Sequence, residues 1–373
     1  MPPKNAPTDF CCPQNREAML LRATSSEPPW PTAAINAVVT EPLSPADVES
    51  DTLGHRADLV EIRADLVGEV AAHVRNHIRG RLVYCLRSRD HGGVFDGSAE
   101  ERHARLLAAA EHYDVVDLEA ERDLIPEVLD RIPVPQRRIS WHGTAADHAV
   151  LRDRFDRMAT VGAGLYLLTT DVSRPEQALA PLRFLHDVAR SDVTAFGTGP
   201  AGFWSRLLAP RLGAPVVFGT VGDGGAAVPT VGRLVADYGF PDLRPVHSVN
   251  GIVGRSVLKS VSPRVHNAGY RTLDVPALYV PFQVEDFSSF WNEVADSGLS
   301  EIGLPLGAVT VVSPHKEAAL TTARTTSHAA RRSGSANSLV RRGDSWFGDT
   351  SNSPAISRAL ADVGVPVSGR KAP

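Results

Sequence analysis

Eight short apolar segments, each suited to a buried β-strand, recur through the first two thirds of the chain and alternate with segments of helical periodicity. They are Ala33–Thr40, Ala57–Arg63, Leu82–Arg87, Val115–Glu119, Arg138–Trp141, Gly164–Thr169, Val193–Gly197 and Pro215–Thr220. Eight strands that alternate with helices over roughly 200 residues predict an α/β fold, a (β/α)8 TIM barrel. A doubly wound open sheet is the alternative.

Charged side chains stand at the ends of several of these segments. Glu61 and Arg63 end the second, Arg87 ends the third, Glu119 ends the fourth, and His142 follows the fifth. In a barrel these side chains converge on one mouth, where barrel enzymes keep their chemistry. In an open sheet they would be spread along an edge, so their distribution favours the barrel.

A smaller α/β domain is predicted after the barrel. Two prolines interrupt the pattern in Phe240–Ser248, and a new strand starts at Asn250–Gly254. We expect strands over Ala277–Phe282 and Ala308–Ser313, helices over Asp286–Ser297 and Pro354–Val363, a hairpin over Gly334–Thr350, and a helix N-cap at Ser262–Pro263.

Composition excludes several classes of protein. A net charge of −4 with mixed signs argues against binding to nucleic acid, and no apolar run reaches the ~18 residues of a membrane-spanning helix. The three cysteines, Cys11, Cys12 and Cys85, are too few for a disulfide framework, so we expect a cytoplasmic protein. Residues 1–30, rich in Pro, Ser and Thr, are predicted to be a disordered tail. No ligand set for a metal is recognised.

Lysine is rare in this chain. Of the 39 basic residues only four are lysines, Lys4, Lys259, Lys316 and Lys371. No lysine lies between positions 4 and 259, so no lysine amine of the predicted barrel can form a Schiff base. Arginine cannot replace it, because the guanidinium stays protonated.

The segment Gly197–Gly202 reads GTGPAG and matches the dinucleotide-binding pattern G-x-G-x-x-G. It follows the seventh strand rather than the first, and the bulky Phe203–Trp204 would hinder close packing of a Rossmann helix. We therefore favour the loop after strand seven of a barrel, with a helix N-terminus and Arg206 facing an anion.

Each of the other candidate residues has a purely structural interpretation as well as a functional one. His142 is either a core histidine or a catalytic one. Arg63, Arg87 and Arg206 are either surface charges or parts of one pocket for a carboxylate.

The same holds in the predicted second domain. Lys316 begins a helix, where the helix dipole disfavours a cation, so a functional role becomes more plausible. Ser260 and Ser262 are either helix caps or hydroxyl groups for a polyol or carboxylate.

Residues from about 33 to 240 resemble type I 3-dehydroquinate dehydratase. The resemblance lies in ADLVEIRADL (57–66), LVYCLRS (82–88), DVVDLEA (114–120), RISWHGT (138–144) and FWSRLLAPRLGAPVVFGTV (203–221). Residues from about 250 to 365 resemble the substrate-binding half of shikimate dehydrogenase, through NGIVGRSVLKSVSPRVHNAGY (250–270), LYVPFQV (278–284), SPHKEAAL (313–320) and SANSLVRRGDSWFGDT (335–350). The order is that of fused enzymes of the shikimate pathway and implies a barrel over 31–242 and a substrate-binding domain over 249–366.

The resemblance assigns roles in the barrel. Glu61, Arg63 and Arg87 fall on substrate-pocket positions, His142 falls on the general acid/base, and Arg206 falls on the arginine that holds the substrate carboxylate. Three family features differ here. Leu167 stands where the Schiff-base lysine is expected, His91 stands for an acidic residue, and the lid glutamine is missing from 226–230.

In the second half, Ser260 and Ser262 match the two carboxylate-binding serines, and Lys316 matches the catalytic lysine. Asn337 matches the asparagine that holds a substrate hydroxyl. Asn352 replaces the catalytic aspartate, unless a loop shift of three residues brings Asp349 into that role.

These differences lead to a functional hypothesis. The resemblance implies NADP in a nucleotide-binding domain that would follow near Ser368–Pro373, so we expect that domain to be absent and this chain to bind no cofactor. We expect a pseudoenzyme that still binds quinate/shikimate-type carboxylates and acts in sensing, scaffolding or regulation. One alternative is an active enzyme, either a non-covalent dehydratase or a reductase whose partner chain supplies the nucleotide domain. A homodimer is also possible, and the decay of a truncated gene is a third class.

Overall fold

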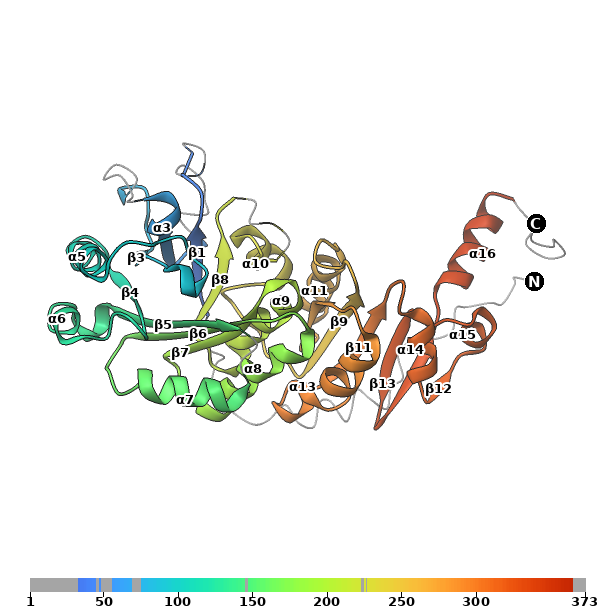
Figure 1. Ribbon diagram of the computed structural model, residues 1–373. Helices are drawn as coiled ribbons and strands as arrows, with labels where there is room; N and C mark the ends of the chain where they lie inside the picture. The colour runs from blue at the N-terminus through green and yellow to red at the C-terminus, as the bar shows by residue number, and fades with distance from the viewer. Residues whose placement is uncertain are drawn as a thin grey trace. The chain divides into compact units, whose positions relative to one another are not determined.

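The computed structural model describes residues 33–364 of the 373, except 45–46, 48–55, 69–74, 145–146, 223–224 and 226. The tail predicted over residues 1–30, with the vicinal Cys11 and Cys12, lies outside the described residues. The strands form two sheets, one of eight strands and one of six (Figure 1). Within the described part of the chain, no helix has the length and hydrophobicity needed to cross a bilayer.

The first sheet is a barrel, as the alternation of strands and helices predicts. Its strands are β1 (Ala34–Val39), β2 (Leu59–Arg63), β3 (Arg81–Cys85), β4 (Val115–Glu119), β5 (Arg137–Thr144), β6 (Leu165–Asp171), β7 (Val193–Thr198) and β8 (Val216–Thr220). They pair in parallel in the order β7-β6-β5-β4-β3-β2-β1-β8. The two end strands of this order, β7 and β8, lie side by side, as the contact between Phe196 and Phe218 shows, so the sheet closes into a barrel and is not a doubly wound open sheet.

The barrel is nearly closed, with a seam between β7 and β8. No ladder joins these two strands among the described residues. The rings of Phe196 on β7 and Phe218 on β8 lie 5.5 Å apart between their centroids. Aromatic packing therefore bridges the seam where backbone hydrogen bonds do not.

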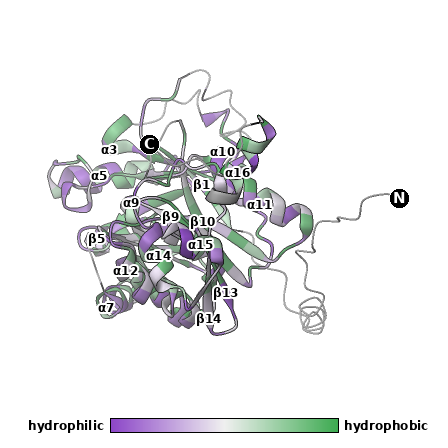
Figure 2. Cartoon of the chain, turned by 90° about the vertical axis from the view of Figure 1, so that its right-hand side faces the viewer, coloured by the Kyte–Doolittle hydropathy of each residue, from purple (hydrophilic) through white to green (hydrophobic). Residues whose placement is uncertain are grey.

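The barrel strands are connected by helices and short 3-10 turns. The helices are α3 (Ala64–Val67), α5 (Ala99–Ala109), α6 (Pro126–Leu129), α7 (His148–Met158), α8 (Leu179–Val188), α9 (Gly199–Leu208) and α10 (Val231–Tyr238); the 3-10 turns are η2 (Arg89–His91), η3 (Val134–Gln136), η4 (Pro175–Ala178) and η5 (Ala209–Leu212). Side chains cap three of the helices: Ser98, Asp147 and Thr230 accept backbone N–H groups of the first turns of α5, α7 and α10. In Figure 2 α5 and α7 show hydrophilic stretches, whereas α9 is mostly hydrophobic.

The second sheet belongs to the smaller α/β domain. Its strands are β9 (Ser248–Gly254), β10 (Ala277–Gln283), β11 (Leu306–Val311), β12 (Thr325–Thr326), β13 (Ser338–Arg342) and β14 (Ser345–Asp349). The order is β10-β9-β11-β13-β14-β12, parallel from β10 to β11 and antiparallel from β11 to β14. The predicted hairpin is thus confirmed as β13–β14.

Helices of this domain differ from the sequence prediction in detail. They are α11 (Ser262–Leu273), α12 (Phe287–Phe290), the π-helical turn Trp291–Ala295, α13 (Gly298–Glu301), α14 (Lys316–Thr322), α15 (His328–Ser333) and α16 (Asn352–Asp362). Ser262 is the first residue of α11 and not its N-cap, which is Val261. The single helix expected over Asp286–Ser297 divides into α12 and the π-helical turn, because i→i+5 bonds replace the α-helical ones.

Helix α9 links the two sheets. Its residues from Ala201 to Leu208 are all buried. It packs on β7 and against β10, where the rings of Trp204 and Phe282 are 5.4 Å apart. An apolar helix enclosed on both sides explains why this segment lacks an exposed polar face.

Candidate functional site

The mouth of the barrel holds a cavity of about 680 Å³. Residues from the strand ends and the following loops line it: Val38, Thr40, Glu61, Arg63, Arg87, Arg89, Asp90, His91, Gly92, His142, Gly143, Thr144, Leu167, Thr169, Asp171, Phe196, Thr198, Gly199, Arg206, Phe218, Thr220 and Val228. All five predicted barrel residues, Glu61, Arg63, Arg87, His142 and Arg206, are among them. The structure thus brings together side chains that lie far apart in the sequence.

A buried ion-pair network adjoins the cavity through Glu61, which lines it. Arg138 Nη1 donates to Glu61 Oε2 at 2.7 Å, and Arg138 Nε donates to Asp117 Oδ1 at 2.5 Å. Asn36 Nδ2 also donates to Glu61 Oε2, at 2.8 Å. Burial alone would raise the pKa of Glu61, but the charges of Arg138 and Arg87 outweigh burial and lower it to about 2. Glu61 is therefore a fixed anion that holds cations in place.

The arginines that line the cavity differ in how far carboxylates compensate their charge. Arg63 forms two hydrogen bonds with Asp65, at 2.8 and 2.7 Å. Arg87 approaches Glu61 only to 3.9 Å. Arg206 is 5% exposed and has no carboxylate within ion-pair distance among the described residues; its guanidinium lies 4.8 Å from the Phe196 ring centroid. Burial lowers the pKa of Arg206 to about 10, so it stays cationic at neutral pH.

Several buried polar atoms of this cavity have no protein hydrogen-bond partner. They are Arg87 Nε, His91 Nδ1, His142 Nε2, Arg206 Nε and Thr220 Oγ1. Buried polar groups in folded proteins are nearly always satisfied, and each one left alone costs about 1–3 kcal/mol. Five such atoms on the residues that line one cavity indicate a site built for a polar ligand, and the two arginines indicate that this ligand is an anion.

His142 is held in a neutral state on β5. Its Nδ1 lies 2.7 Å from Thr169 Oγ1 on β6. Burial, followed by the charges of Arg87, His91, Arg138 and Arg63, lowers its pKa well below 6.5. His142 lines the cavity, and its buried Nε2 has no protein hydrogen-bond partner. A neutral imidazole nitrogen can accept or donate one hydrogen bond.

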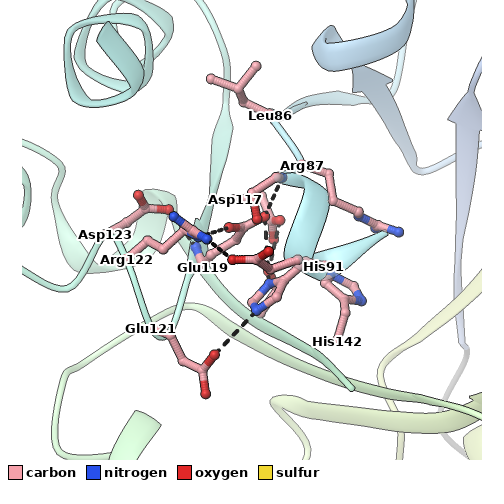
Figure 3. A network of polar contacts seen from close by, with 12 residues as sticks. Leu86, Arg87, His91, Asp117, Glu119, Glu121, Arg122, Asp123 and His142 are labelled. Carbon is pink, nitrogen blue, oxygen red and sulfur yellow. Dashed lines mark hydrogen bonds and ion pairs between the residues drawn. The ribbon is translucent and has the colours of Figure 1, made fainter. Parts of the chain in front are cut away.

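His91 on η2 lies beside His142, with ring centroids 5.7 Å apart (Figure 3). It is bracketed by two carboxylates, because its Nδ1 is 3.6 Å from Glu119 and its Nε2 is 3.6 Å from Glu121. Arg122 lies 3.6 Å from Glu119 on the other side. Two carboxylates thus lie beside His91, in a position where the resemblance expects an acid.

Leu167 on β6 lines the cavity and is 2% exposed. The strand pairs Leu167 with Ser140 on β5 and with Thr194 on β7. Since the sequence has no lysine between positions 4 and 259, no lysine of the barrel itself reaches this mouth.

The glycines of GTGPAG serve helix packing. A Cβ added to Gly202 would lie 2.5 Å from the carbonyl carbon of Gly197, so only glycine lets α9 approach β7 this closely. Gly199 lines the barrel cavity and has a φ of +78°. This placement agrees with the seventh-strand interpretation, as β7 and α9 show.

The residues predicted in the second domain form two pairs. Ser260 Oγ donates to Ser262 Oγ at 3.1 Å, just before and at the start of α11. Asn337 Nδ2 donates to Asn352 Oδ1 at 2.8 Å and to Ser351 Oγ at 3.0 Å. Lys316 begins α14, and its carbonyl accepts the Ala336 N–H at 2.9 Å, which places it next to Asn337 in the backbone. No hydrogen bond among the described residues joins the serine pair to the asparagine pair.

Sequence reasoning missed the ion pairs that hold Glu61 and part of the cavity wall. Arg138 begins the fifth predicted segment, Asp117 lies inside the fourth, and Thr169 ends the sixth. The available signal was their alternation with apolar neighbours, since inward-facing positions recur every second residue. No cluster of three or more potential metal-ligating side chains occurs in the described ranges.

Comparison with known proteins agrees with this two-part structure. The family described as type I 3-dehydroquinase matches residues 37–240, and the shikimate dehydrogenase substrate binding domain matches residues 252–339. The bifunctional 3-dehydroquinate dehydratase/shikimate dehydrogenase of Arabidopsis thaliana chloroplasts is 28% identical over 303 residues, which cover 77% of this chain and 48% of that protein. A shikimate dehydrogenase (NADP(+)) of Hyphomonas neptunium is 37% identical over 122 residues, or 32% of this chain and 43% of that one.

One solved structure, dehydroquinate dehydratase and shikimate dehydrogenase from S. pombe AroM, aligns with a TM-score of 0.46 and 18% identity, covering 91% of this chain and 68% of that chain. The chain spans about half the length of the Arabidopsis relative. Because the first family match covers more than half of the 373 residues, the chain belongs to the type I 3-dehydroquinase family and continues into a shikimate dehydrogenase-like substrate-binding domain.

Proposed function

We propose that the barrel mouth binds a small cyclic hydroxy-carboxylate of the dehydroquinate and shikimate class, reversibly and without a covalent step. The observation that carries this proposal is the cavity in which Arg87, Arg206 and His142 present polar atoms without protein partners. Such a ligand supplies a carboxylate for the arginines and hydroxyl groups for the imidazole and Thr220.

The charge of Arg206 supports a carboxylate in particular. A buried guanidinium without a counter-ion is costly, and a ligand carboxylate offsets that cost with charge-assisted hydrogen bonds. Neighbouring arginines are already paired with carboxylates, Arg63 with Asp65 and Arg138 with Glu61 and Asp117. Arg206 is therefore the group that we expect to hold the carboxylate.

Leu167 supports binding without imine chemistry. An imine makes the ligand's ketone an electron sink, and leucine cannot form one. No other lysine lies in the barrel segment to replace it. We therefore propose a pseudoenzyme, a barrel that senses or regulates through ligand binding rather than through turnover.

The second domain is proposed to bind the same class of ligand more weakly. The hydroxyls of Ser260 and Ser262 offer donors to a carboxylate, and the amides of Asn337 and Asn352 offer partners for ring hydroxyls. Asn352 does not relay a proton as an aspartate does. The backbone of Lys316 lies beside that of Asn337. We propose that this domain keeps binding groups and loses the acid/base partner.

Calorimetric titration of the whole chain with 3-dehydroquinate, 3-dehydroshikimate, shikimate and quinate tests this proposal. We expect saturable binding of at least one of these ligands at the barrel, lost in Arg206→Met and kept in Arg152→Met, since Arg152 is an exposed residue of α7 paired with Asp156. Absence of heat with all four ligands would refute the proposed function.

The alternative function is a barrel that dehydrates its ligand, and the neutral His142 is the observation that favours it. His142 lines the cavity and its Nε2 has no protein partner, so we consider it as the base of a non-covalent elimination. Ultraviolet absorbance of the enone product measures this activity, with Leu167→Lys as a gain-of-function control. Turnover by the natural sequence that disappears in His142→Ala would favour this alternative over the pseudoenzyme.

A further inference from the structure

Arg211 is a buried cation that the barrel site does not use. It belongs to η5, the turn that follows α9, and is 8% exposed. Its Nη1 donates to the carbonyl oxygen of Arg244, while its Nε has no protein partner. Burial lowers its pKa to about 10, which leaves it charged at neutral pH. A neutral carbonyl does not balance that charge.

The nearby carboxylates form ion pairs with other arginines. Asp237 is paired with Arg233 and Arg264, and Asp274 is paired with Arg244. Across the described ranges, no carboxylate lies within ion-pair distance of Arg211, although the exposed Asp242 lines the same cavity. Removing a charge from water without a partner costs several kcal/mol. An uncompensated guanidinium beside a cavity therefore indicates a place for a counter-ion.

The cavity beside Arg211 is small and rich in donors. Its volume is about 30 Å³, enough for one water molecule or one monatomic ion. Its walls contain Tyr238 and the guanidinium-bearing residues Arg211, Arg244 and Arg271. The excess of cations over carboxylates favours an anion over a water molecule, because water cannot compensate the net charge.

We propose that this cavity is a binding site for a small monatomic anion, chloride in the cell, which joins the barrel to the second domain. Three parts of the chain meet there: η5 through Arg211, the connecting segment through Arg244, and α11 through Arg271. Arg244 Nη1 also donates to the carbonyl oxygen of Arg271 at 2.9 Å. An anion that contacts these groups stabilises the connection between the two domains, so it acts independently of ligand binding in the barrel mouth.

Crystals of the whole chain soaked in sodium bromide locate such an anion directly. We expect an anomalous bromide peak within hydrogen-bonding reach of Arg211 Nε. Absence of bromide there, while bromide is found at other surface positions, would overturn the proposal. This experiment needs no variant and holds even if substitution of Arg211 prevents folding.

Thermal unfolding provides the matched measurement in solution. With sodium gluconate keeping the ionic strength constant, bromide or chloride is expected to raise the unfolding midpoint by roughly 2–4 °C with saturation at millimolar concentrations. Arg211→Met should lose this dependence, whereas Arg183→Met should keep it, because Arg183 joins the two domains through Glu301 instead. A rise that does not saturate, or one that persists in Arg211→Met, contradicts a specific site.

Discussion

The barrel mouth and the serine and asparagine pairs of the second domain, both proposed to bind the same class of ligand, differ in how their polar groups are compensated. In the barrel, Arg138 forms ion pairs with Glu61 and Asp117, so these buried charges compensate one another. The buried Arg206 has no carboxylate partner among the described residues. In the second domain, neutral groups satisfy one another, Ser260 with Ser262 and Asn337 with Asn352. A ligand must therefore displace existing hydrogen bonds in the second domain, whereas it completes unsatisfied ones in the barrel.

This contrast indicates which of the two sites should contribute more binding free energy. A charge-assisted hydrogen bond in a buried site contributes more than a neutral one that replaces an equivalent protein contact. The barrel is consequently expected to dominate affinity, and substitutions of its charged residues to have larger effects than substitutions of serine or asparagine. The predictions below sharpen or break this comparison.

Arg206→Met should weaken binding of the carboxylate ligand by about 100- to 1,000-fold, or roughly 3–4 kcal/mol, because one partner of a buried charge pair is removed. The unliganded protein should be as stable as the natural one or more stable, since the uncompensated charge is also removed. Calorimetry and urea unfolding measure the two effects. A tenfold loss or less would show that Arg206 does not hold the carboxylate.

Glu61→Gln should destabilise the chain by about 3 kcal/mol at pH 7, because the lowered pKa of Glu61 reports its interaction with Arg138 and Arg87. This stabilisation is present above the unfolded pKa near 4.5 and is lost as the pH falls toward about 2. The natural chain should therefore lose stability across that window more steeply than the variant. Urea unfolding from pH 7 down to pH 3 measures the difference, and parallel curves would contradict the assignment.

Ser260→Ala should weaken the proposed binding in the second domain by only about two- to tenfold, the range of one neutral hydrogen bond. It also removes the acceptor of the Ser262 N–H at the start of α11, which should cost about 1 kcal/mol of stability. Titration of shikimate in the Arg206→Met background isolates this domain. A loss as large as that of Arg206→Met would erase the proposed difference between the two sites.

His142 should make the smallest contribution to the free energy of unfolding, and this contribution should depend on pH. Burial lowers its pKa, so the native state holds a neutral imidazole while the unfolded chain binds a proton below pH 6.5. Stability is therefore complete above about 6.5 and declines as the pH falls toward the native pKa. His142→Gln should flatten the stability curve between pH 6.5 and 5, as thermal unfolding in matched buffers would show. An unchanged slope would place His142 in contact with water rather than in the buried position.

Much of the fold follows from local patterns in the sequence. Each of the eight predicted segments overlaps one of β1–β8, because a parallel barrel strand is buried on both faces and therefore continuously apolar. The seam between β7 and β8 was not predictable, since strand pairing depends on the curvature of the whole sheet. The two-residue β12 and the short α15 also carry too few residues for a periodic signal.

The candidate site was predictable in part for the same reason. Charges at strand ends, such as Arg63 and Arg87, are conspicuous after an apolar run and must face the mouth of a barrel. Arg138 and Asp117 were missed because they lie inside strands, and only the tertiary structure shows that they compensate Glu61. The lack of a partner for Arg206 likewise becomes visible only once every neighbouring carboxylate has been placed.

Equilibrium dialysis of the whole chain against labelled 3-dehydroquinate tests the central claim most directly, because it measures bound ligand and its chemical fate together. We predict saturable binding at the barrel, with the free ligand recovered unchanged after equilibrium. Conversion of the free ligand into 3-dehydroshikimate would contradict a binding barrel without turnover. Equal concentrations of ligand on both sides at every protein concentration would contradict binding itself.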